Sequence, residues 1–256
     1  MCELLGMSAN VPTDICFSFS GLMRRGGRTG DHRDGWGIAF YEGNGCRTFH
    51  DPKPSADSEI ATLIKNSTIK SKIVISHIRK ATHGRVCMEN THPFVREMWG
   101  RNWTFAHNGR LDGVKQRKLR HYHPVGTTDS EHAFCWMLDK IRRRHPTPPS
   151  ARKPLSGLIQ ELSDELAGHG VFNMLLSSSH ELYAFSTTKL SYLTRRAPFG
   201  PAALIDDDLT VDFKEETSPN DIVTVIATLP LTEDEPWVAF KHNRLYLFRD
   251  GLAARA

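Results

Sequence analysis

Short runs of β-branched and aromatic residues recur along the chain, and each run is bounded by residues that favour turns. Such side chains pack well on the pleated surface of a sheet, so the runs predict β-strands. Seven strands are expected, over residues 36–41, 72–76, 103–107, 171–177, 181–186, 221–227 and 244–248.

Apolar residues at helical spacing predict two further elements. One helix begins at the capping box formed by Thr128 and Glu131, and the other carries an apolar stripe from Leu155 to Leu166 that ends near Gly168. Shorter helices are expected over residues 13–22 and 57–65.

The order of these elements bears on the fold class. Strands outnumber helices and do not alternate regularly with them, which favours packed sheets with helices outside over a doubly wound parallel fold. The proline-rich stretch over residues 145–150 ends a helix and is expected to join elements of one domain. A single domain over residues 1–256 is therefore predicted.

The composition excludes several classes of protein. The chain is 39% hydrophobic and 24% charged, as in globular proteins, and its net charge is only +4. Basic residues are scattered except for 142–144, where they complement a helix dipole, so no nucleic-acid surface is expected. No apolar run reaches the roughly 18 residues of a membrane span, and the first residues do not form a signal peptide.

The cysteine pattern indicates a reducing compartment. The chain has five cysteines: Cys2, Cys16, Cys46, Cys87 and Cys135. They are widely spaced and form no CxxC pair, which argues against a disulfide framework and favours the cytoplasm. His121 and His123 have no acidic or cysteine partner at a recognisable spacing, so neither a metal nor another cofactor is expected.

Cys2 directly follows the initiator methionine. Its small side chain suits removal of Met1, which would leave a free α-amine on the residue that carries the thiol. An α-amine and a thiol titrate near 8 and 8.5 in peptides, so proton transfer between them is close to thermoneutral. Cys2 is therefore a candidate nucleophile that carries its own base, the alternative being a structural cysteine.

A polar turn follows the strand that ends at Ser76, and it contains Arg79, Thr82 and His83. An arginine can hold a carboxylate through two parallel hydrogen bonds, and the other two side chains can add more. The alternative is a structural ion pair beside a turn.

Asn108 and Gly109 follow another predicted strand. This dipeptide is the strongest short signal for a tight hairpin turn. The same geometry can direct the Asn108 amide and the Gly109 N–H at one spot, where they would hold an oxyanion. The two interpretations are compatible.

Asp129 lies in the first turn of a predicted helix, where the dipole favours a carboxylate. Its alternative role is to receive a substrate ammonium group. The glycine-rich segment between Arg24 and Gly37 can approach a small site closely, although it lacks the pattern of a phosphate-binding loop.

In this order, Cys2, the 79–84 segment, Asn108-Gly109 and Asp129 resemble the motifs of the class II glutamine amidotransferases, which are N-terminal-nucleophile hydrolases. The whole chain resembles their stand-alone, YafJ-like branch. The resemblance implies an α+β fold, a four-layer αββα sandwich in which two stacked antiparallel sheets lie between helical layers.

The resemblance also implies a reaction, the release of ammonia from the side-chain amide of glutamine. Cys2 attacks the amide carbon and forms a γ-glutamyl thioester, with its α-amine carrying protons, while Asn108 and Gly109 stabilise the oxyanion. Water then resolves the thioester to glutamate.

Substrate recognition follows from the same resemblance. Arg79 binds the α-carboxylate of glutamine with Thr82 and His83 nearby, and Asp129 binds the α-ammonium. A zwitterionic amino acid needs one cation and one anion, and the chain supplies both.

Two alternatives remain open from the sequence. The chain has no room for a synthase domain, so a separate partner accepts the ammonia or the enzyme hydrolyses γ-glutamyl peptides or conjugates. The alternative from another class is a catalytically silent binding subunit, which predicts that Met1 is retained because an acylated nitrogen cannot act as a base.

Overall fold

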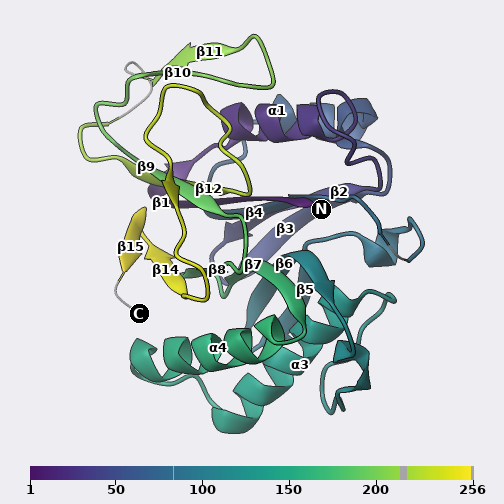
Figure 1. Cartoon of the computed structure of the whole chain (residues 1–256). Coiled ribbons are helices and arrows are strands. Elements are labelled where there is room, and N and C mark those ends of the chain that lie inside the picture. Colours follow the sequence, from purple (N-terminus) through teal and green to yellow (C-terminus); the bar gives the residue numbers. More distant parts are fainter. Residues whose placement is uncertain (83, 214–217, 255–256) are drawn as a thin grey trace.

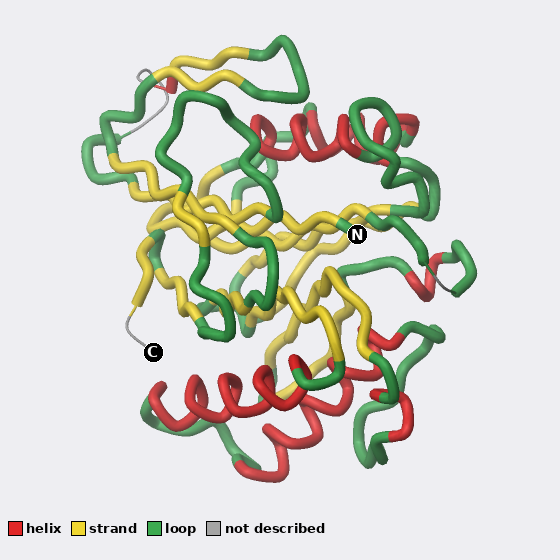
Figure 2. The backbone as a smooth tube through the Cα atoms, in the orientation of Figure 1, coloured by secondary structure: helices red, strands yellow, loops and turns green. Residues whose placement is uncertain are grey.

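The computed structural model describes residues 1–82, 84–213 and 218–254. Two antiparallel sheets stack face to face, and helices cover the outer side of each sheet (Figures 1 and 2). The four main helices are α1 (Cys16–Arg25), α2 (Glu59–Lys65), α3 (Asp129–Arg144) and α4 (Arg152–Ala167). Short 3₁₀ helices cover Ser55–Asp57, Met88–Asn90 and Val114–Gln116.

The first sheet has seven strands, in the order β13 (Val238–Ala239), β9 (Ser191–Arg196), β12 (Ile222–Ala227), β1 (Glu3–Thr13), β4 (Ser71–Ile78), β2 (Trp36–Glu42) and β3 (Gly45–Asp51). The second has six, in the order β15 (Leu252–Ala254), β14 (Tyr246–Arg249), β8 (Leu182–Phe185), β7 (Gly170–Ser177), β6 (Arg101–Leu111) and β5 (Phe94–Met98). A separate hairpin joins β10 (Pro201–Ala203) to β11 (Thr210–Asp212).

Three apolar clusters fill the spaces between the four layers. On β1, Leu5 and Met7 face the cluster under α1 and α2, whereas Leu4 faces the cluster between the sheets. A third cluster packs α3 and α4 against the second sheet. Successive side chains of a strand point to opposite faces, so a strand in the middle of this sandwich is buried on both. The α+β sandwich of two stacked antiparallel sheets is confirmed.

The seven predicted strands are all present, in β2, β4, β6, β7, β8, β12 and β14. The two clear helices are α3 and α4, and residues 145–151, which include the predicted 145–150 stretch, join them. Of the weaker helices, the one expected over 13–22 begins later, at Cys16, and the one expected over 57–65 begins at Glu59 with Ser58 as its N-cap. Strands β1, β3, β5, β9, β10, β11, β13 and β15 were not predicted. Strand β1 shows no alternation, β3 is largely exposed, and the last four have only two or three residues each.

The prediction of a hairpin turn at Asn108 and Gly109 is wrong. Strand β6 continues to Leu111, and Gly109 pairs with Phe172 of β7. A Cβ atom at Gly109 would lie 1.8 Å from the Val171 carbonyl oxygen, so a close approach between two strands requires this glycine.

Within the described residues, no helix is both long and apolar enough to cross a lipid bilayer.

Candidate active site

Cys2 lies directly before β1, at the end of the sheet where β4 also ends. The backbone N–H of Lys80 donates a hydrogen bond to Sγ at 3.3 Å. Burial raises the pKa of the Cys2 thiol above its usual value, whereas the Lys80 N–H, the N-terminal ammonium and the Arg79 guanidinium lower it. The Asp34 carboxylate raises the pKa slightly further. The thiol is thus held where positive groups oppose the cost of burying a thiolate.

The loop before β2 fixes the segment that contacts Cys2. The Arg79 N–H donates to the Gly35 carbonyl at 2.8 Å, and the Asp34 N–H donates to the Arg79 carbonyl at 3.0 Å. The Asp34 carboxylate also accepts from the Ala81 N–H at 2.6 Å. These three bonds hold residues 79–81 in one conformation beside the thiol.

The Arg79 side chain is buried, with the residue only 4% exposed. Its Nη1 donates to the Arg85 carbonyl at 3.0 Å, and a Cβ atom at Gly84 would lie 3.5 Å from its Nη2. The guanidinium therefore lies beneath the polar turn that follows β4.

Asn108 is fully buried in β6. Its carbonyl oxygen accepts a hydrogen bond from Asn173 Nδ2 at 3.0 Å, which fixes the backbone at this position. By contrast, both polar atoms of the Asn108 side chain are buried without a hydrogen-bond partner among the described residues. A buried amide left unpaired costs about 1–3 kcal/mol, so it calls for an explanation such as a ligand.

Two buried histidines lie with their rings tilted against each other. The rings of His77, on β4, and His92 have centroids 4.2 Å apart. Burial lowers the pKa of His77 to about 3 and lowers that of His92 as well, so both rings are neutral at pH 7. His107, beside Asn108 on β6, lies close to His77, and its Nδ1 is 2.8 Å from Ser130 Oγ at the start of α3.

Asp129 is the first residue of α3. Its Oδ2 accepts from the Leu111 N–H at 2.8 Å and its Oδ1 accepts from the Ser130 N–H at 2.9 Å. Thr128 caps this helix by accepting from the Glu131 N–H, as half of a capping box does. The prediction of a first-turn acid is therefore confirmed in its geometry.

A pocket of about 420 Å³ opens beside Asp129. Thr82 and Gly109 also line it, so the pocket brings together predicted site residues from the polar turn, β6 and α3. Cys2, Arg79 and Asn108 are not among the described residues that line it. His83, the remaining predicted site residue, lies outside the described residues.

The family model of the class II glutamine amidotransferases matches residues 1–256. The chain belongs to the class II glutamine amidotransferases. It is 59% identical over 248 residues to the putative glutamine amidotransferase YafJ of Escherichia coli, covering 97% of each chain.

Solved structures agree with this class II glutamine amidotransferase assignment. A predicted glutamine amidotransferase from Pseudomonas aeruginosa is 50% identical, with a TM-score of 0.79 and full coverage of both chains. The glutamine phosphoribosylpyrophosphate amidotransferase of B. subtilis is 15% identical, with a TM-score of 0.64 over 99% of this chain and 48% of that one. This second likeness supports the fold alone.

Several residues around this candidate site were not predicted from the sequence. Asp34 braces the 79–81 segment, Asn173 braces Asn108, and the rings of His77 and His92 contact each other. The Asp34-Gly35-Trp36-Gly37 run had indicated only a close loop. No local pattern could have found Asn173, because its partner comes from a different strand.

Proposed function

We propose that this amidotransferase releases ammonia from the side-chain amide of glutamine through a γ-glutamyl thioester on Cys2, once Met1 has been removed. One observation carries the proposal. The Cys2 thiol is buried beside positive groups that oppose the rise in its pKa, and the buried side-chain amide of Asn108 lacks a hydrogen-bond partner among the described residues. Removing Met1 would bring the terminal ammonium one residue closer to Sγ, which favours the thiolate further.

In the first step, the α-amine of Cys2 takes the thiol proton as Sγ bonds to the amide carbon. The C=O electron pair moves to oxygen, and Asn108 Nδ2 and the Gly109 N–H donate to the resulting oxyanion. Such a donor typically lowers a barrier by about 3 kcal/mol. The buried Asn108 amide then gains the partner it lacks.

In the second step, the oxyanion collapses and the C–N bond breaks, with the ammonium proton passing to the leaving nitrogen. Ammonia departs and the γ-glutamyl thioester remains. Water attacks the thioester, the amine accepts its proton, and glutamate leaves with the thiol restored.

Arg79 would bind the α-carboxylate of the substrate, and Asp129 would bind its α-ammonium. Both oxygens of Asp129 already accept backbone hydrogen bonds, which orients the carboxylate beside the pocket. Thr82 lines the same pocket and would add a hydrogen bond, as would His83. The catalytic unit would span residues 1–256, and a separate protein would consume the ammonia.

A substrate screen tests the proposal. Purified protein without Met1, verified by intact mass, is offered glutamine and a panel of γ-glutamyl amides and peptides, with glutamate release as the readout. The Cys2→Ala variant should lose more than about a thousandfold in kcat/KM while keeping its fold. Cys46→Ala, a cysteine on β3, is the matched control and should retain activity.

Other outcomes separate the alternatives. Turnover of γ-glutamyl conjugates with little turnover of glutamine would keep the machinery and change the substrate. A homogeneous population from the native host that retains Met1 would instead support a silent binding subunit. Full activity in Cys2→Ala would refute the nucleophile.

A further inference from the structure

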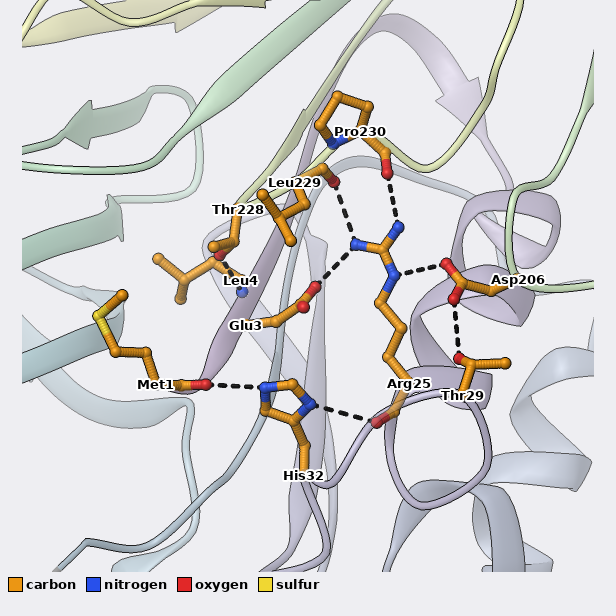
Figure 3. Close-up of polar contacts among 10 residues, drawn as sticks. All are labelled: Met1, Glu3, Leu4, Arg25, Thr29, His32, Asp206, Thr228, Leu229 and Pro230. Atoms are coloured by element: carbon orange, nitrogen blue, oxygen red, sulfur yellow. Dashed lines mark hydrogen bonds and ion pairs between the residues drawn. The ribbon is translucent and has the colours of Figure 1, made fainter.

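We propose that His32 positions the α-amine of Cys2 after Met1 is removed, a role that rests on the proposed function of that amine as a proton carrier. His32 lies in the loop between α1 and β2. Its Nε2 is 2.7 Å from the Met1 carbonyl oxygen, and its Nδ1 is 3.2 Å from the Arg25 carbonyl oxygen (Figure 3). The imidazole thus contacts the peptide group that removal of Met1 destroys.

Hydrogen-bond chemistry decides what His32 does in the processed chain. A carbonyl oxygen only accepts hydrogen bonds, whereas a neutral imidazole has one N–H donor and one acceptor nitrogen. With Met1 in place, both ring nitrogens face carbonyl oxygens, and a neutral ring can satisfy only one of them. Removal of Met1 takes away the carbonyl oxygen that faces Nε2 and leaves the Arg25 carbonyl oxygen that faces Nδ1.

Removal of Met1 then creates a new hydrogen-bond donor for His32 Nε2, the α-amine of Cys2. Water cleaves the bond between Met1 and Cys2, so methionine leaves with a carboxylate and the Cys2 nitrogen becomes an amine. Within a peptide group, that nitrogen lies about 2.3 Å from the carbonyl oxygen. An N–H of the new amine can therefore donate to His32 Nε2 while Nδ1–H stays on Arg25. This leaves the amine lone pair to take the thiol proton.

Arg25 contacts both His32 and Glu3, the residue that follows Cys2. Its buried guanidinium donates from Nη1 to the Glu3 carboxylate at 2.8 Å and from Nε to the Asp206 carboxylate at 2.6 Å (Figure 3). It also donates to the carbonyl groups of residues 229 and 230. The residue that holds His32 through its carbonyl therefore also holds Glu3, the neighbour of Cys2.

Two substitutions at His32 distinguish the contribution of Nε2 from that of Nδ1. The amide of His32→Asn reaches only the place of Nδ1, whereas the amide of His32→Gln reaches the place of Nε2. Each variant is released from a cleavable N-terminal fusion so that Cys2 is the first residue, and intact mass verifies the cleavage. The measurements are kcat and KM for glutamine, and the rate of Cys2 alkylation by iodoacetamide at pH 7.

His32→Asn should lower kcat at least about tenfold with KM nearly unchanged, because misplacing a reacting group by about 1 Å can cost a hundredfold. The alkylation rate should fall by a similar factor. His32→Gln should stay within about threefold of the wild type in both measurements. His50→Asn is the control and should change neither, since His50 Nε2 contacts the Pro93 carbonyl.

Equal losses in the two His32 variants would overturn the proposal, because a merely structural histidine gives no such distinction. An unchanged His32→Asn would overturn it too. If the wild type releases glutamate from no amide but alkylation still separates the variants, the proposed function fails and the positioning role stands.

Discussion

The layer between the two sheets has an apolar part and a polar part, and single strands run through both. On β4, Ile73 and Ile75 lie in the apolar cluster between the sheets, and His77 follows on the same face. On β6, Ala106 lies in that cluster and Asn108 follows. The apolar part stabilises the sandwich. The polar part lowers the stability, because it buries polar groups that a bound substrate could hydrogen-bond.

The largest expected effect concerns the apolar part. Leu175 is fully buried between the sheets, so Leu175→Ala should lower the free energy of unfolding by about 2–5 kcal/mol. Denaturant unfolding measures this loss, and kcat of the folded fraction should change little. Leu63→Ala, at a position 66% exposed on α2, should cost less than about 0.5 kcal/mol.

The polar part should respond in the opposite way. Asn108→Ala should lower kcat by about a hundredfold or more, roughly 3 kcal/mol of barrier, because an oxyanion donor is lost. Its free energy of unfolding should hold or rise, since a buried unpaired amide disappears. Asn102→Ala on the same strand should leave kcat intact, because its side chain accepts from the Cys46 N–H. A wild-type kcat in Asn108→Ala would contradict the proposed difference between the polar and apolar parts.

Arg79→Lys tests recognition. A lysine keeps the charge but loses the planar pair of donors, so kcat/KM for glutamine should fall about tenfold, mainly through KM. Steady-state kinetics measure the change. Arg47→Lys, at an exposed arginine on β3, is the control. An unchanged specificity constant would exclude Arg79 from carboxylate binding.

A further effect, small at any pH near neutrality, concerns acid stability. Burial depresses the pKa values of His77 and His92, so below about pH 6.5 the unfolded chain binds protons there that the native chain does not. Stability should therefore be present above pH 6.5 and be lost as pH falls, by up to about 1.4 kcal/mol per pH unit for each histidine.

The free energy of unfolding of His92→Gln, measured between pH 4 and 8, isolates the contribution of proton binding at His92. Its offset from the wild type at pH 8 reports the structural cost, and the reduced slope below pH 6.5 reports the lost titration. Parallel curves would show that His92 is protonated in the native state as well.

The sequence predicted most of the fold, because β-branched runs and helical stripes are local signals. It missed β1 because a strand buried on both faces, with Leu4 and Leu5 in different clusters, shows no alternation. The candidate site was predicted through motifs at Cys2 and Asn108. Its supporting groups were not, since Asp34 and Asn173 act on partners distant in sequence.

The place of β1 has a consequence for the order of events during synthesis. This strand is made first, yet its sheet neighbours are β4 and, near the other end of the chain, β12. The sheet cannot close around β1 until β12 has been synthesised. In the proposed function, an aminopeptidase would therefore meet an N-terminus that the sheet does not yet enclose, and removal of Met1 would precede the enclosure of the thiol.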